Sequence, residues 1–97
     1  MRLAAVLTNI ADQQSVAASA TSVTLSAEDK TRLGLSIYND STADLYVLFG
    51  PAGPASTTAF SVKLSGGGYY EVPIGYVGPI YGIWSSASGA ARITRFV

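Results

Sequence analysis

The sequence predicts an all-β protein, built as a small antiparallel β-sandwich or a jelly-roll-like barrel of seven to eight short strands with an N-terminal arm. Short apolar runs alternate with polar residues, and turn residues recur at intervals of about 8–12 residues. No stretch carries the spacing of a stable amphipathic helix. The 97 residues suit a single domain.

The arm is predicted to comprise residues 1–14 and the β-sandwich domain residues 15–97. Gln13 and Gln14 end the apolar pattern of the arm. Because a terminal segment is ordered only when something ties it down, we expect the arm to add to a sheet edge, its own or a neighbour's. The alternative is that the arm is simply the first strand of the domain.

The first half of the domain is predicted to contain short strands joined by turns. Residues 15–20 and 23–25 alternate weakly, and residues 26–31 form a loop or a single 3₁₀ turn. Residues 33–38 alternate well, whereas residues 45–49 are apolar on both faces. The latter pattern predicts a central strand or a face covered by another chain. With the turn NDST between them, these two strands are interpreted as an antiparallel hairpin.

The second half continues this pattern. A proline- and glycine-containing loop at 51–58 leads to a strand at 59–65. The three glycines at 66–68 are predicted to form a hairpin turn into a strand at 69–73. After a bend, strands at 80–85 and 91–97 enclose a turn at 86–89.

In each predicted strand, the alternate apolar side chains that face the interior are expected to form the hydrophobic core. Its expected members are Leu35, Ile37, Leu45, Val47, Phe60, Val62, Val72 and Trp84.

The surface is predicted to carry few charges. Hydrophobic residues make up 48% and charged residues 12% of the chain, about half the typical charged share of roughly 25%. Six basic and six acidic residues give a net charge of zero. We therefore expect part of the surface to contact other subunits, with little electrostatic repulsion between copies.

The composition disfavours an enzyme and predicts no catalytic, metal-binding or cofactor-binding residue. Histidine and cysteine are absent, so the usual ligands of zinc, haem and iron–sulfur clusters and a Ser-His-Asp triad are missing. Asp40 and Asp44 flank one turn, but a catalytic acid pair needs a pocket that separates its pKa values. A calcium site at Asp40, Ser41 and Asp44 would supply few oxygens.

The basic residues are scattered along the chain, which disfavours nucleic-acid and anionic-membrane binding. No apolar run approaches the length of a membrane-spanning helix, and polar residues interrupt the apolar start too early for a secretory signal. A small-molecule ligand is not expected either.

Tyrosine and apolar arm residues are the candidates for protein contacts, because tyrosine is typical of interface hot spots and of sugar-binding platforms. For any single tyrosine the alternative is a place at the rim of the core. The predicted interface residues are Leu3, Val6, Leu7, Ile10, Tyr69, Tyr76 and Tyr81.

Three segments, IYNDSTADLYV, GGYYEVP and GIWSSASGAARIT, resemble small virion proteins of tailed bacteriophages. In that group a polypeptide of this pattern occurs alone or as a module of capsid, neck or tail structural proteins. The resemblance covers about four-fifths of the chain, from about residue 15 to the end. Its segments consist of turn and core residues, so they identify the family better than the place in the virion.

The resemblance implies a non-enzymatic β-sandwich that assembles on a particle surface, with a homotrimer favoured. It favours a capsid decoration or cement protein, which binds the phage major capsid protein and stabilises the assembled shell. Such a protein belongs to the virion and is assembled in the bacterial host cytoplasm. The alternative is a receptor- or glycan-binding module of a tail fibre, spike or neck protein.

Overall fold

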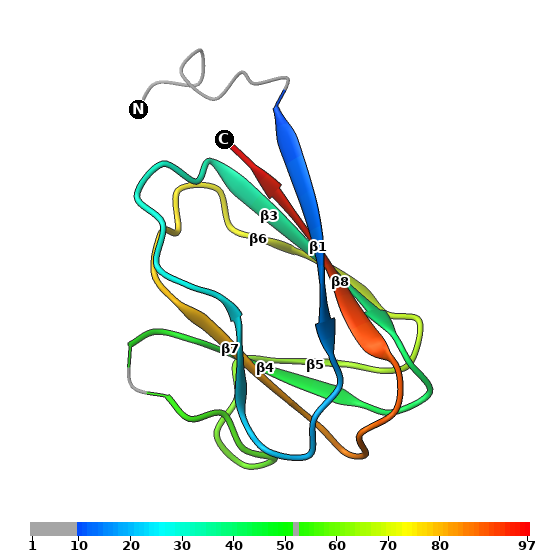
Figure 1. Ribbon diagram of the computed structural model, residues 1–97. Coiled ribbons are helices and arrows are strands. Elements are labelled where there is room, and N and C mark those ends of the chain that lie inside the picture. Colours follow the sequence, from blue (N-terminus) through cyan, green and yellow to red (C-terminus); the bar gives the residue numbers. More distant parts are fainter. Residues whose placement is uncertain (1–9, 52) are drawn as a thin grey trace.

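The computed structural model describes residues 10–51 and 53–97, which form eight strands in two antiparallel sheets (Figure 1). Sheet 1 has the order β1-β8-β3-β6 and sheet 2 the order β2-β7-β4-β5. The predicted all-β sandwich is confirmed. The strands are β1 (Ala11–Ala17), β2 (Val23–Ser26), β3 (Gly34–Asp40), β4 (Leu45–Phe49), β5 (Val62–Leu64), β6 (Tyr69–Val72), β7 (Ile80–Trp84) and β8 (Ala90–Phe96).

The strand pairing is that of a long two-stranded ribbon rolled up on itself. β4 pairs with β5 at the tip of the ribbon, and β3–β6, β2–β7 and β1–β8 follow towards its ends. Rolling the ribbon brings β8 beside β3 and β7 beside β4. Eight strands paired in this way form a jelly roll. The described chain is therefore a sandwich with jelly-roll connectivity.

Both predicted hairpins are wrong. β3 and β4 lie in different sheets, and so do β5 and β6 on either side of the three glycines. In a rolled ribbon, strands that follow one another along the chain mostly lie in opposite layers, and only the β4–β5 connection stays within one sheet. An arch between two layers and a hairpin within one sheet use the same turn-forming residues. The local sequence pattern therefore does not distinguish an arch from a hairpin.

The side chain of Asn39, at the end of β3, ties the two arches and β7 together. It is completely buried, with 0% exposure. Its Nδ2 donates to the carbonyl oxygens of Ala43 (2.8 Å), Leu64 (3.0 Å) and Ser65 (3.1 Å). Its Oδ1 accepts a hydrogen bond of 3.1 Å from Nε1 of the buried Trp84. One amide thus satisfies carbonyls from both arches and the indole N–H of the core.

The backbone of Asn39 strengthens the same junction. Its N–H donates to the carbonyl of Gly68 and its carbonyl accepts from the N–H of Gly67, both at 2.8 Å. Gly67 has a φ of +80°, a conformation that favours glycine. The Ser41 hydroxyl donates to Asn39 Oδ1 at 2.7 Å. The two arches are therefore bonded to each other through one residue.

The core lies between the sheets and agrees with prediction at six positions. Leu35, Ile37, Leu45, Val47, Val72 and Trp84 are buried. Val62 is only half-buried, and Phe60 is 39% exposed, so its predicted burial is wrong. The reason is that β5 begins at Val62, so the strand alternation does not extend back to Phe60, whose ring packs edge-on against Tyr46 instead.

For residues 11–14 of the predicted arm, the structure shows the alternative, the first strand of the domain. These residues belong to β1, which pairs with β8 from Ala11 to Ala17 at the edge of sheet 1. Main-chain hydrogen bonds hold this exposed edge strand, and they require no apolar pattern from Gln13 and Gln14. Residues 1–9 lie outside the described residues.

Replacing Asn39 by alanine is expected to lower the free energy of unfolding by about 3–5 kcal/mol. The substitution removes the Asn39 partner of the Trp84 indole and of the Leu64 carbonyl, whereas the Ala43 carbonyl keeps the Ser41 hydroxyl at 3.2 Å. Each unsatisfied buried group costs about 1–3 kcal/mol. Urea unfolding followed by tryptophan fluorescence measures the change. Ser41→Ala, which removes a hydroxyl nearer the surface, is the control and should cost about 1 kcal/mol. A loss for Asn39→Ala no larger than that of the control would contradict the central role of this amide.

Candidate functional site

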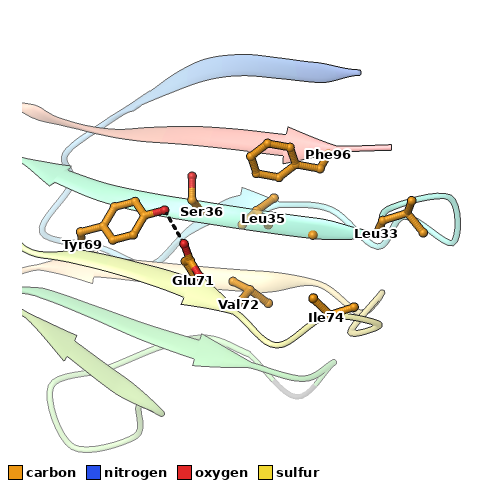
Figure 2. Close-up of a pocket in the computed structure, with 9 residues that line it drawn as sticks. Leu33, Leu35, Ser36, Tyr69, Glu71, Val72, Ile74 and Phe96 are labelled. Atoms are coloured by element: carbon orange, nitrogen blue, oxygen red, sulfur yellow. Dashed lines mark hydrogen bonds between the residues drawn. The ribbon is translucent and has the colours of Figure 1, made fainter. Parts of the chain in front are cut away.

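An apolar groove lies on the outer face of sheet 1, over the start of β3 (Figure 2). Phe96 of β8 stands on one side of β3, and β6 with the residue Ile74 that follows it stands on the other. The groove is lined by Leu33, Gly34, Leu35, Ser36, Tyr69, Glu71, Val72, Ile74 and Phe96.

The groove is hollow because Gly34 contributes no side chain to its floor. Gly34 pairs with Phe96 across the sheet, and a Cβ atom on Gly34 would lie 3.6 Å from the Phe96 ring, an ordinary contact distance. A glycine inside a strand often marks a place where another group approaches the backbone closely. Space at this position is therefore open to a side chain from elsewhere.

Exposed large apolar side chains gather around this groove. Ile74 is 70% exposed, Tyr69 57% and Phe96 36%. The described residues contain six such exposed side chains, and half of them line this one groove. A cluster of this kind marks a contact surface more strongly than scattered exposed residues do.

A polar row continues the site along the outer face of sheet 1. Tyr69 pairs with Tyr38, which pairs with Arg92 on β8. The Arg92 guanidinium donates to Asp40 at 2.9 Å and to the Ser15 hydroxyl at 2.6 Å. The row therefore presents two tyrosine rings beside a fixed ion pair.

One acid lies at the edge of the groove. The Tyr69 hydroxyl donates to the Glu71 carboxylate at 3.0 Å (Figure 2), and this hydrogen bond raises the pKa of Tyr69. Among the described residues, Glu71 is the only charged one that lines the groove.

An ion cluster outside the groove ties the beginning of β1 to β8 and to the loop before β3. Arg95 on β8 donates to Asp12 on β1 at 2.7 Å and also to Asp29 in the loop before β3. The Thr31 hydroxyl donates to Asp29 at 2.6 Å. Hydrogen bonds from Thr31 and Arg95 lower the pKa of Asp29 from 3.8 to about 2, and the pKa of Arg95 is raised by its bonds to Asp12 and Asp29.

The structure does not bring the three predicted tyrosines together. Tyr69 lines the groove, whereas Tyr81 points outward from sheet 2, where the backbone of Gly53 lies against its ring. Tyr76 is half-buried at the rim of the core: its hydroxyl donates to the Pro79 carbonyl at 2.8 Å, and its ring packs on Phe49. For Tyr76 the alternative place, at the core rim, is the observed one.

Tyr76 also contributes to the burial of a cation. Arg32 is 1% exposed and donates to the carbonyl oxygens of Tyr76, Gly78 and Ala27 and to the hydroxyl of Ser26. Desolvation by burial lowers the pKa of Arg32. This guanidinium joins the loop after β2 to the loop after β6 and is not available to an outside partner.

Of the four arm residues predicted to form an interface, Ile10 is described, and Leu3, Val6 and Leu7 lie outside the described residues. The side chain of Ile10 is 55% exposed, and its carbonyl accepts a hydrogen bond of 3.2 Å from the N–H of Val97. The described chain therefore begins beside the end of β8, next to the groove.

Of the groove residues, sequence reasoning identified only Tyr69 as a contact candidate, and Gly34, Ile74 and Phe96 are among those that it missed. Gly34 interrupts an otherwise regular alternation, and this signal could have marked the floor of the groove. Ile74 follows Pro73 in a segment that was predicted to be a bend. The exposure of Ile74 depends on the position at which the chain leaves β6, and the sequence pattern does not predict that position.

Sheet 2 offers a second partly apolar outer face. β4 lies between β7 and β5, which confirms the predicted central strand. Its side chains Tyr46 and Leu48 point away from the core and are half-exposed beside Ile83 and Tyr81 of β7. Both outer faces of the sandwich thus carry large apolar side chains.

No protein-family model, curated protein or solved structure matches this chain. Within residues 10–51 and 53–97, no three or more carboxylate, imidazole or thiol side chains come together in a group able to hold a metal ion. Nor does that part of the chain form a helix with the length and apolarity needed to span a membrane.

Stability is expected to fall as the pH decreases from about 5 to about 2, in part because of Asp29. The pKa of Asp29 is lower in the folded protein than in an unfolded chain, so its carboxylate stabilises the fold above about pH 4 and loses this effect as it is protonated. Urea unfolding across this pH range should show a shallower decline for Asp29→Asn than for the wild type. Asp44→Asn is the control, because the Asp44–Lys63 pair is exposed and long, at 3.7 Å. Equal pH dependence of Asp29→Asn and wild type would contradict the assignment.

Proposed function

We propose that the protein is a non-enzymatic structural component of a tailed-bacteriophage virion, and specifically a capsid decoration or cement protein. In this role it binds the major capsid protein on the particle surface and stabilises the assembled shell. It acts as a homo-oligomer, with a trimer favoured, and is assembled in the cytoplasm of the bacterial host.

The observation that carries this proposal is the jelly-roll topology with large apolar side chains on both outer faces. Eight-stranded jelly rolls include viral capsid domains, so the fold suits a repeated shell component. Fold alone does not define function. The outer faces add a physical reason for assembly, because exposed apolar clusters are typical of protein–protein contacts.

The sequence resemblance supports the same role. Its three segments supply β3 and β4, β6, and β7 with β8. They include the Asn39 junction and Trp84, so a chain that shares them is expected to share the rolled ribbon. The proposal joins this resemblance to the surface features described above.

The second candidate is a receptor- or glycan-binding module of a tail fibre, spike or neck protein. The row of Tyr69, Tyr38 and Arg92 favours it, because an aromatic ring beside fixed hydrogen-bonding groups is suited to sugars. Jelly rolls also include lectin domains.

Purified virions should contain the protein at a stoichiometry comparable with that of the major shell protein, since a decoration protein occupies a site repeated over the whole lattice. Quantitative mass spectrometry of purified particles measures this ratio. A ratio far below that of the shell protein would favour the fibre, spike or neck alternative. Absence from particles would refute both.

The purified protein is expected to show no saturable binding to host cell-surface polysaccharide, measured by titration calorimetry. Binding that Tyr38→Ala abolishes and Phe60→Ala leaves intact would instead support the glycan-binding candidate. The two variants remove aromatic rings of similar exposure, one from β3 in sheet 1 and one from the loop before β5, against Tyr46 of sheet 2. The comparison therefore isolates the row on sheet 1.

A further inference from the structure

We propose that the groove on sheet 1 binds residues 1–9 of a second copy of this chain, so that copies are linked by exchange of their N-terminal segments. This inference names the occupant of the candidate site and rests on the proposed function as an assembling protein. It is independent of which virion component the protein binds.

The apolar character of the segment matches that of the groove. Leu3, Val6 and Leu7 are large apolar residues in a stretch with one charge, that of Arg2. The groove offers the exposed side chains of Phe96 and Ile74 over an open floor. Placing the segment there removes apolar surface from water on both partners.

The charges of the segment and the groove are also complementary. The ion pairs of the described residues involve five of the six acidic side chains, and the one left over is Glu71 at the groove. Arg2 lies in the segment and is its one charged side chain. An extended segment in the groove would bring positive charge to the one acid without an ionic partner among the described residues.

The direction of β1 favours a second copy over the segment's own domain. Ala11 pairs with Phe96, and Ile10 lies beside Val97, so at its first described residue the chain is directed away from the end of sheet 1. A segment that enters the groove of its own domain from that point needs a reversal of direction. Residues 1–9 contain neither glycine nor proline, and Asn9 is their main turn-forming residue. A neighbour's groove requires no reversal.

The segment is long enough to reach a neighbour. Nine extended residues span about 30 Å, and the described domain measures 24 Å and 17 Å across its two shorter axes. A domain packed alongside therefore lies within reach.

The test uses full-length chains with a changed segment or a changed groove. The segment variant carries Leu3→Ser and Leu7→Ser. The groove variant carries Gly34→Val, which fills the floor at a position where a Cβ meets only the Phe96 side chain. Phe60→Ser is the matched control, because Phe60 is about as exposed as Phe96 but lies outside the groove.

Sedimentation velocity at micromolar concentration gives the first result. Wild type and Phe60→Ser should sediment as oligomers, and the segment and groove variants as monomers of 10.0 kDa. Far-UV circular dichroism and thermal melting confirm that each variant is folded. If Gly34→Val does not fold, Ile74→Glu takes its place, since Ile74 is the most exposed of the large apolar side chains described.

Mixing the two variants gives the decisive result. The segment variant keeps an intact groove, and the groove variant keeps an intact segment, so an equimolar mixture should form a complex of two chains. Docking of each segment on its own domain predicts that the mixture stays monomeric.

Three results would overturn the proposal: a monomeric wild type, an oligomer that survives in both variants, or a mixture that remains monomeric. All three concern purified protein. They are therefore distinguishable from failure of the proposed function, which the virion stoichiometry decides.

Discussion

The fold depends on one buried amide more than on any other polar group described. Asn39 offers two N–H donors and a carbonyl, and the structure uses all of them on groups that could not otherwise be buried without cost. The carbonyls of Ala43 and Ser65 belong to the two arches, and the Trp84 indole belongs to the far sheet. A single side chain thus fixes the corner at which the ribbon passes twice from one layer to the other. An apolar residue there would leave several buried groups without partners.

This corner decides which faces of the molecule meet solvent. Because the ribbon crosses between layers after β3 and again before β6, these two strands pair with each other in sheet 1, and β8 joins them as the roll closes. The outward residues of these three strands, from chain positions far apart, then form the groove and the polar row. The groove is therefore a product of the roll, and no local segment encodes it.

The sequence was most informative where one residue's environment depends on its own strand. The alternation at Leu35 and Ile37 correctly predicted burial, and the two apolar faces of β4 correctly predicted a central strand. Asn39 was recognised only as a turn residue, because its role depends on carbonyls 25 and 26 positions away. The burial predicted for Phe60 assumed that the strand alternation includes it, but β5 begins only at Val62. The tyrosines could not be sorted into groove, core rim and opposite face without knowing which strands share a sheet.

Most charged side chains of the described residues form ion pairs or hydrogen bonds within the domain. Arg32 is buried among carbonyls, Arg95 binds Asp12 and Asp29, and Arg92 binds Asp40. Lys30 and Lys63 lie near Glu28 and Asp44 in longer exposed pairs, which contribute little to stability. Neighbouring opposite charges cancel at a distance, so the outer faces present a weak field and carry apolar side chains between the pairs. Contacts made by such faces derive their affinity from buried apolar area and from shape. Association of this protein should accordingly depend much less on ionic strength than that of a charge-steered complex.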